Sequence, residues 1–179
     1  MRGLISDEVL NRAVQVRLMI FDVDGVLTDG TLTLTETGAE IKAFNVRDGL
    51  GLKILKESGV EVALLSARRS RTVELRAAEL GIALVEQGVA DKGAAFERLL
   101  DRRGLPAAAA GYMGDDLADL PVLVRCGFAA SVPEAPDAVR RRVHYVTGTG
   151  GGRGAAREVC ELIMQAQNTL ERAIARSLA

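Results

Sequence analysis

Two groups of aspartates stand where strands of a sheet would present them to a ligand. The motif Asp22-x-Asp24-Gly25 directly follows one short apolar run, and the pair Asp115-Asp116 closely follows a later one. Carboxylate oxygens from two separate segments make a hard oxygen site that suits Mg²⁺, which usually keeps waters and takes a substrate phosphate oxygen. These residues therefore predict magnesium-dependent chemistry on a phosphate group.

Two further polar residues would complete such a site. Ser66 ends another apolar run, and Lys92 follows a third. A hydroxyl and an ammonium beside the metal would hold the remaining phosphoryl oxygens. One aspartate can then attack phosphorus and form an aspartyl-phosphate, a known covalent strategy.

Each of these residues alone has a simpler interpretation. A DxDG motif is also typical of turns and calcium loops, but position 12 of an EF-hand counted from Asp22 is Thr33 rather than Glu. The later aspartate pair alone is consistent with a helix N-cap, and the serine or the lysine alone with a solvated surface. The ordered set, with each member at the end of an apolar run, favours a reactive site.

The segments that must position these residues alternate between two patterns. Strand-like runs cover residues 17–21, 60–65, 82–85, 109–113, 127–130 and 143–146, and helical patterns cover residues 50–57, 70–80 and 92–103. This alternation predicts an α/β fold with a doubly wound, mostly parallel, Rossmann-like sheet. Ligands of open α/β sheets bind outside the carboxyl ends of the strands, so we expect the polar residues to converge on one rim.

Two segments depart from the alternation. A period of two around a glycine-bearing turn predicts a β-hairpin over residues 31–44. An isolated hairpin is marginal in water, so we expect a partner subunit to cover its apolar side chains, Leu32, Leu34, Ile41 and Phe44. Residues 147–154 (TGTGGGRG) are typical of a flexible linker, and a C-terminal tail helix is expected over residues 155–177.

The composition indicates one soluble domain over residues 1–179. The 179 residues are 48% hydrophobic and 26% charged, with a net charge of -1. The balanced charge and the 3% aromatic content argue against nucleic acid as a partner. No apolar run approaches the roughly 18 residues that span a bilayer, and two cysteines are too few for a disulfide framework. We therefore expect a cytoplasmic protein without a membrane partner.

The ordered set resembles the haloacid dehalogenase superfamily of aspartate-nucleophile phosphohydrolases. The signatures are Asp22-x-Asp24-Gly, a strand-ending Ser66, Lys92 and the motif GDDxxD that begins at Gly114. Three longer motifs, DVDGVLTDG from Asp22, KAFNVRDG from residue 42 and GGRGAAREVC from residue 151, are similar to those of its capless sugar-acid phosphatases. The similarity covers residues 17–167.

The resemblance implies a role for each matching residue. Asp22 would be the nucleophile and a metal ligand, and Asp115 the second carboxylate ligand of Mg²⁺. Asp24 would protonate the leaving alkoxide and then deprotonate the attacking water, while its main-chain carbonyl binds the metal. Ser66 would hydrogen-bond the phosphoryl oxygens, and Lys92 would neutralise them. The positions that match substrate contacts are Asp24, Asn45, Val46, Arg47, Asp48, Gly49, Lys53, Arg68, Arg76 and Lys92.

Two positions depart from the family's pattern. Ser66-Ala67-Arg68 stands where the family commonly has Thr-Gly-Arg, so the hydroxyl is kept and a glycine is lost. Lys53 stands where arginine is expected, which keeps the charge but loses the bidentate fork.

The spacing of the motifs leaves no room for a lid domain of the roughly 50 residues that a domain needs. We expect the site to be open or to be closed by another subunit. The resemblance implies a homotetramer whose hairpins pack together and whose tail, with Arg153, reaches a neighbour's site. It also implies a sugar phosphate with an eight-carbon acid as the substrate, in lipopolysaccharide precursor synthesis.

Two alternatives stay open. Within the same class, the substrate would be a nine-carbon acylneuraminate phosphate. Outside it, a non-enzymatic receiver-type phosphoacceptor domain shares the sheet, an acidic pair, a hydroxyl and a lysine. The acidic pair of a receiver precedes its phosphoacceptor strand, whereas here the DxDG segment comes first.

Overall fold

The computed structural model describes residues 5–176 and 178, and its centre is a six-stranded sheet in which every pairing is parallel. The strands lie in the order β5-β4-β1-β6-β7-β8. Their bounds are β1 Leu18–Phe21, β4 Glu61–Ser66, β5 Leu84–Gln87, β6 Ala110–Met113, β7 Phe128–Ser131 and β8 Tyr145–Val146. The predicted doubly wound sheet is confirmed, and each predicted strand overlaps an observed one.

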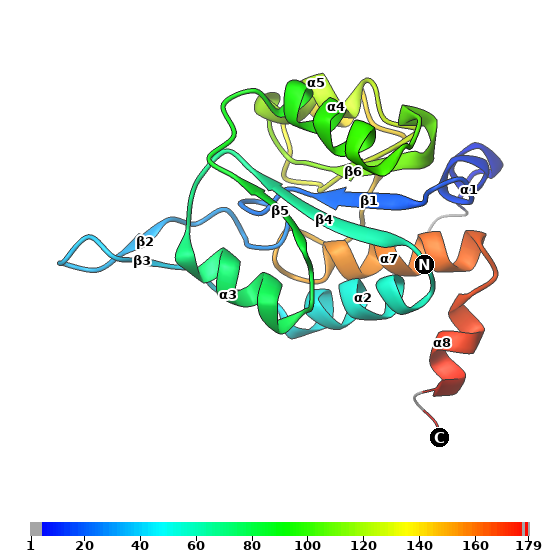
Figure 1. Ribbon diagram of the computed structural model, residues 1–179, viewed down its shortest axis with the longest axis horizontal. Coiled ribbons are helices and arrows are strands. Elements are labelled where there is room, and N and C mark those ends of the chain that lie inside the picture. The colour runs from blue at the N-terminus through cyan, green and yellow to red at the C-terminus, as the bar shows by residue number, and fades with distance from the viewer. Residues whose placement is uncertain (1–4, 177, 179) are drawn as a thin grey trace.

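The strand order reverses at β1, which has β4 on one side and β6 on the other (Figure 1). Phe21 pairs with Leu64 of β4 and with Met113 of β6. The backbone N–H of Asp22 continues the ladder to the carbonyl of Met113 at 2.9 Å. The segments that follow β1, β4 and β6 therefore leave the sheet side by side, at a switch point of the kind that binds ligands.

Helices cover both faces of the sheet (Figure 1). One face carries α2 (Val46–Glu57), α3 (Arg71–Glu79) and α7 (Ala155–Ala166), and the other carries α4 (Lys92–Arg103) and α5 (Leu120–Leu123). The remaining elements are α1 (Asp7–Ala13), α6 (Asp137–Arg140), α8 (Leu170–Arg176), and the 3₁₀ turns η1 (Ala107–Ala109) and η2 (Leu117–Asp119). Strands covered on both faces are nearly continuous apolar runs, and β1, β6 and β7 are buried at every residue. In the described part of the chain, every helix is too short or too polar to span a membrane.

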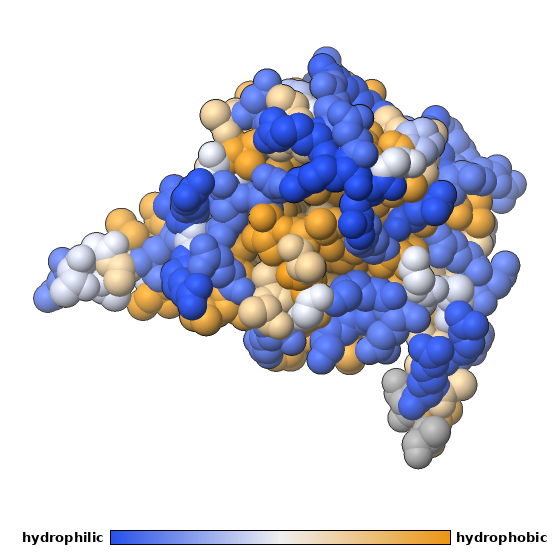
Figure 2. Space-filling view, in the orientation of Figure 1, coloured by the Kyte–Doolittle hydropathy of each residue, from blue (hydrophilic) through white to orange (hydrophobic). Residues whose placement is uncertain are grey.

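The predicted hairpin is present as β2 (Thr33–Leu34) and β3 (Glu40–Ile41), and it projects from the body of the molecule (Figure 1). Phe44 at its root packs against the core. Leu32, Leu34 and Ile41 remain 51%, 58% and 54% exposed, and apolar surface is visible along the hairpin in Figure 2. The subunit expected to cover these side chains stays a prediction.

The C-terminal tail differs from the single helix expected over residues 155–177, of which residue 177 lies outside the described residues. Helix α7 ends at Ala166, and α8 begins at Leu170 and points away from the sheet (Figure 1). Asn168 between them has a φ of 56°. Asparagine tolerates this left-handed conformation better than most residues, and a helix ends where it occurs.

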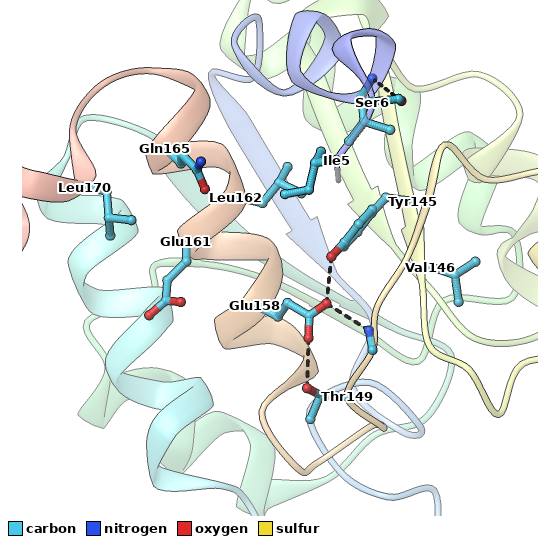
Figure 3. A pocket seen from close by; sticks show the side chains of 12 residues that line it. Ile5, Ser6, Tyr145, Val146, Thr149, Glu158, Glu161, Leu162, Gln165 and Leu170 are labelled. Atoms are coloured by element: carbon cyan, nitrogen blue, oxygen red, sulfur yellow. Dashed lines mark hydrogen bonds between the residues drawn. The ribbon is translucent and has the colours of Figure 1, made fainter. Parts of the chain in front are cut away.

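The glycine-rich segment of residues 147–154 is a packed loop rather than the flexible linker expected. The buried carboxylate of Glu158 accepts hydrogen bonds from Tyr145 Oη at 2.7 Å, Gly148 N at 2.8 Å and Thr149 Oγ1 at 2.8 Å (Figure 3). These bonds hold the start of the loop beside a cavity of about 680 Å³ that shares no lining residue with the predicted site. Further along, Gly152 N donates to the carbonyl of Val26 at 2.9 Å, so the loop lies against the DxDG segment.

Candidate active site

The aspartates that follow β1 and β6 meet as predicted. Asp22, Asp115 and Asp119 each place a carboxylate oxygen within 4.8 Å of the others. Gly25 makes this approach possible, because a β-carbon there would lie 2.0 Å from Oδ2 of Asp115 and its φ is +93°. Only glycine accepts both the contact and the backbone conformation. The sheet therefore delivers three acids to one point at its rim.

Lys92 is the cation of this cluster. It is the first residue of α4, which begins after the N-cap Asp91, and it is buried. Its Nζ lies 2.9 Å from Oδ1 of Asp22 and 2.6 Å from Oδ1 of Asp119. Burial alone would lower the pKa of Lys92, but the two carboxylates outweigh burial and raise it. The lysine is therefore charged.

Asp119 is held more firmly than the other two acids. Its Oδ1 accepts from Lys92 at 2.6 Å and from Tyr112 Oη at 2.6 Å. Its Oδ2 accepts from the backbone N–H groups of Asp115 at 3.0 Å and Asp116 at 3.1 Å. Asp119 thus orients both the lysine and the loop that carries Asp115. Asp116 at the same time caps η2, as the simpler interpretation of the acidic pair proposed.

Burial and the neighbouring carboxylates raise the pKa of two acids of this cluster. Burial, reinforced by the charge of Asp119, raises the pKa of Asp22 to about 6 even though Lys92 opposes the change. Burial, reinforced by Asp22 and Asp119, raises the pKa of Asp115 to about 8. One lysine does not balance three acids in so small a space. A divalent cation would relieve the repulsion between them, and oxygen donors of this kind suit a hard cation.

Ser66 lies at the end of β4, next to β1, as predicted, and it is buried. Its Oγ accepts from the backbone N–H of Arg68 at 3.2 Å, and a serine hydroxyl that accepts can still donate its own hydrogen. Ala67 between them does not adopt a positive φ, since Asn168 is the one non-glycine residue that does so in the described ranges 5–176 and 178. The glycine lost at position 67 is therefore not needed for backbone conformation.

The side chain of Asp24 turns toward the hairpin rather than into the acid cluster. It forms an ion pair with Lys42, whose Nζ also lies 3.2 Å from Glu40. Arg68 Nη2 lies 3.0 Å from the same oxygen of Glu40. The carboxylate of Asp24 is thus held by Lys42, which directly follows β3, while its backbone stays in the loop after β1.

The predicted substrate loop, residues 45–49, has both exposed and interior members. Val46 is 78% exposed and Arg47 is also exposed. Asp48 is buried, and its carboxylate accepts from the backbone N–H groups of Gly154 at 3.1 Å and Arg157 at 2.8 Å. The side chain of Asp48 therefore caps α7. Both of its oxygens accept from the first turn of that helix, and its expected contact with substrate stays a prediction.

Gly49 and Asn45 also have interior partners. A β-carbon on Gly49 would lie 2.1 Å from Nη2 of Arg76, so the glycine makes room for that guanidinium. Arg76 donates to the carbonyl of Asn45 at 3.4 Å and lies over the ring of Phe44. Asn45 caps α2 and donates to the carbonyl of Gly152 at 3.2 Å. These residues hold the loop in place, and their contact with substrate stays a prediction.

Two expected substrate residues lie at the surface. Lys53 is on the exposed side of α2. Arg153 is exposed and lines a surface cavity of about 370 Å³ together with Arg47 and Arg157 of the same chain. The loop that carries Arg153 packs on its own chain, and the reach of the tail to a neighbouring site stays a prediction.

A comparison with known proteins identifies the family. The chain is 44% identical over 176 residues to the 3-deoxy-D-manno-octulosonate 8-phosphate phosphatase KdsC of Yersinia pestis, and the match covers 98% of this chain and 94% of that protein. The chain belongs to the 3-deoxy-D-manno-octulosonate 8-phosphate phosphatase family. No protein-family model matches the chain.

Solved structures agree with this phosphatase family. The Moraxella catarrhalis 3-deoxy-D-manno-octulosonate 8-phosphate phosphatase, crystallised with magnesium, phosphate and KDO, has a TM-score of 0.94 at 43% identity and covers 96% of this chain and 98% of its own. A Legionella pneumophila hydrolase of the haloacid dehalogenase superfamily has a TM-score of 0.93 at 40% identity, covering 96% and 94%. The predicted superfamily is confirmed, and membership of a phosphatase family decides against the receiver-type alternative.

Three side chains of this phosphatase site were not assigned a role from the sequence. Asp119 belongs to the motif GDDxxD, but its hydrogen bonds with Lys92 and Tyr112 depend on the position of η2 in the fold. Lys42 stood in a motif without a stated role. Tyr112 looks like an ordinary core residue of β6. Only the motif membership of Asp119 and Lys42 could have drawn attention to them.

Proposed function

We propose that the protein hydrolyses 3-deoxy-D-manno-octulosonate 8-phosphate to 3-deoxy-D-manno-octulosonate and phosphate, through an aspartyl-phosphate on Asp22. One observation carries this proposal: Asp22, Asp115 and Asp119 share a space of 4.8 Å with a charged, buried Lys92 at the switch point of the sheet. The relatives named for this substrate support the choice of sugar.

The chain fits magnesium at this point. Burial, together with the negative charge of the neighbouring acids, raises the pKa values of Asp22 and Asp115. A cation would offset that charge, and the donors are all oxygens. Asp22, Asp115 and the main-chain carbonyl of Asp24 would hold the ion, and Asp119 would orient the lysine and the loop. Bound there, Mg²⁺ supplies charge neutralisation for the phosphoryl oxygens.

In the first step, a carboxylate oxygen of Asp22 attacks phosphorus as the bond from phosphorus to the sugar oxygen breaks. The carboxylic acid of Asp24 gives its proton to the departing sugar oxygen. Lys92, already 2.9 Å from the attacking carboxylate, and the Ser66 hydroxyl hold the phosphoryl oxygens. Preorganised donors of this kind cost no reorganisation during the reaction.

In the second step, water attacks the phosphorus of the aspartyl-phosphate. Asp24, now a carboxylate, takes a proton from that water, and the bond between phosphorus and Asp22 breaks to release phosphate. Asp24 thereby regains the proton that it gave to the sugar oxygen. While Asp24 is protonated, the carboxylate of Glu40 remains the charged partner of Lys42. General acid–base catalysis of this type contributes about 10²–10⁴-fold.

The sugar acid would be held by the loop of residues 45–49 and by nearby cations. The exposed Arg47 and Val46 are the side chains of that loop best placed to meet a ligand, and Lys53, Arg68, Arg76 and Lys92 complete the expected contact set. A nine-carbon acylneuraminate phosphate is the alternative substrate of the same chemical class.

The assembly we propose is a homotetramer in the cytoplasm, which acts in lipopolysaccharide precursor synthesis. The exposed Leu32, Leu34 and Ile41 on a projecting hairpin support burial against other subunits. Light scattering of the purified chain tests this: a monomer at micromolar concentration would contradict it.

The activity is tested by phosphate release from the eight-carbon and nine-carbon substrates, each with Mg²⁺ and with excess chelator. We expect multiple turnovers on the eight-carbon substrate, a lower kcat/KM on the nine-carbon one, and loss of both rates in chelator. A rapid acid quench during turnover should retain labelled phosphate on the wild-type chain and none on Asp22→Asn. Equal labelling of both chains, or turnover in chelator, would contradict the mechanism.

A further inference from the structure

A chain of ion pairs lies outside the acid cluster and joins three segments of the site. It runs from Asp24, after β1, to Lys42 and Glu40 of the hairpin, and on to Arg68, after β4. The separations are 3.2 Å between Lys42 and Glu40 and 3.0 Å between Glu40 and Arg68. Nothing in the phosphoryl-transfer step described above uses Lys42.

Lys42 is the best shielded member of this ion-pair chain. Its side chain is 3% exposed, against 27% for Asp24 and 14% for Glu40. A lysine this far from water needs its carboxylate partners, since a buried charge without a partner is costly. Its ammonium therefore cannot easily leave Asp24 for solvent, and the contact restrains the Asp24 side chain.

The backbone next to Asp24 is restrained separately. Thr28 Oγ1 accepts from the N–H of Gly25 at 3.3 Å and of Gly30 at 3.2 Å, which closes the loop after β1. That loop fixes where the side chain of Asp24 begins, but not which way its carboxyl points. The direction is set by Lys42, which reaches it from the hairpin.

We propose that Lys42 is a positioning residue that aims the carboxyl of Asp24 for proton transfer, and that Glu40, which is itself paired with Arg68, holds Lys42 for this purpose. The inference rests on the proposed function, in which Asp24 gives a proton to the sugar oxygen and later takes one from water. Both transfers require the same carboxyl within hydrogen-bond reach of its partner. In a chain without a lid domain, the root of the hairpin supplies this orientation.

The test compares two esters in which the leaving group needs the proton to different degrees. An alkyl ester, 3-deoxy-D-manno-octulosonate 8-phosphate, has a poor leaving group, whereas 4-nitrophenyl phosphate has a good one. The comparison uses kcat/KM, because this quantity reports the steps up to departure of the leaving group and is not affected by hydrolysis of the aspartyl-phosphate. A purely structural role would lower both values alike.

The variants are Lys42→Met, which keeps the length but removes the charge, and Lys42→Arg, which restores the charge. We expect Lys42→Met to lose about 100-fold in kcat/KM on the sugar phosphate and less than a tenth of that on the aryl phosphate. Lys42→Arg should recover most of the loss. Lys56→Met is the matched control, because Lys56 donates to main-chain carbonyls near Gly81, away from the acid cluster. It should keep the wild-type ratio of the two rates whatever it does to the melting temperature.

Equal losses on both esters, or a wild-type rate of Lys42→Met on the sugar phosphate, would overturn the role of Lys42. A rise in KM of similar size for both esters would also overturn it, since that result would make Lys42 a ligand of the phosphoryl group. A wild-type chain that releases phosphate from neither ester would overturn the proposed function itself. The two failures are thus distinguished by the wild-type rates alone.

Discussion

The two halves of the site are built in different ways. The phosphoryl half, with Asp22, Lys92 and Asp119, is buried and joined by contacts of 2.9 Å or less. The proposed substrate half, with Val46 and Arg47, lies on the first turn of α2 and is exposed. A buried group of charges that is joined by ion pairs and hydrogen bonds resists rearrangement, whereas exposed side chains can change conformation. We therefore expect the buried residues to determine the reaction and the exposed residues to determine the choice of sugar.

The largest effect separating the two halves is expected from Asp22→Asn. The amide cannot form the aspartyl-phosphate, so turnover should fall by at least about 10⁴-fold. The fold should survive, because the pKa of the buried Asp22 carboxyl is already raised to about 6, so its charged form is unfavourable in the folded chain. Phosphate release measures the first effect and thermal unfolding the second. Activity within tenfold of wild type would contradict the covalent route.

Asp119→Asn is expected to reduce turnover less than Asp22→Asn and to reduce stability as well. The amide oxygen can still accept from Lys92 and Tyr112, but the buried lysine loses a negatively charged partner. The amide NH₂ would also face the backbone N–H groups of Asp115 and Asp116, which now donate to Oδ2. Breaking a buried ion pair typically costs about 3–5 kcal/mol, and we expect a loss of that order in chemical denaturation together with a lower kcat.

Tyr112→Phe is the control for this prediction, because it removes one hydrogen bond to Asp119 and leaves the ion pair in place. Its cost should be about 1.5–3 kcal/mol, as for a hydrogen bond to a charged group. If the two variants were equally stable and equally active, the orienting role of Asp119 would be refuted.

The acid cluster should make both the stability of the chain and its affinity for magnesium depend on pH. The pKa values of Asp22 and Asp115 rise from 3.8 to about 6 and about 8, because of burial and neighbouring acids. The folded chain then keeps protons that the unfolded chain has lost, so these groups favour folding at low pH. Their contribution falls as the pH rises from about 4 to about 8. Magnesium must displace the same protons, so its affinity should rise more than tenfold between pH 6 and pH 8.

This prediction is measured by thermal unfolding in chelator and by calorimetric titration with Mg²⁺. Asp115→Asn serves as the reference, and the difference from wild type isolates the acid whose pKa is about 8. Relative to this variant, the wild type in chelator should lose stability as the pH rises. A wild type whose stability relative to Asp115→Asn stays constant or increases as the pH rises would count against the crowded acid cluster, and so would a magnesium affinity that does not change.

The smallest effects are expected in the substrate half. Asp48→Ala removes the cap of α7 formed by its contacts with Gly154 and Arg157, and should cost about 0.5–2 kcal/mol. Arg47→Ala should change stability by less than about 0.5 kcal/mol and raise KM with kcat nearly unchanged. Denaturation and steady-state kinetics measure both. A lower kcat with an unchanged KM for Arg47→Ala would contradict this expectation, because it would indicate a role in phosphoryl transfer rather than in substrate binding.

The convergence of Asp22, Asp115, Ser66 and Lys92 on one rim was predictable because each of them ends or follows a strand of one parallel sheet. Parallel strands present their carboxyl ends at one rim, so any polar residue that follows a buried strand arrives there. The alternation of apolar runs and helical patterns was sufficient to indicate those strands. For this half of the site, local pattern and topology carry nearly all of the information.

The contacts that orient these residues could not be predicted in the same way. Asp48 caps a helix that begins more than a hundred residues later, and Asn45 reaches Gly152 across a similar distance in sequence. The break at Asn168 and the packing of the glycine-rich loop are also decided by neighbours from elsewhere in the chain. Composition had indicated flexibility for that loop, since glycine is permissive, but burial against the DxDG segment overrides the permissiveness.

The sequence by itself determined the chemistry, because residue types and their places at strand ends are local properties that survive any detail of packing. The tertiary structure alone decided which carboxylate faces the lysine, which faces the hairpin and which becomes a helix cap. Those contacts form between side chains that meet only after the sheet and its covering helices have assembled. Burial and the neighbouring groups then set the free-energy cost of each charge.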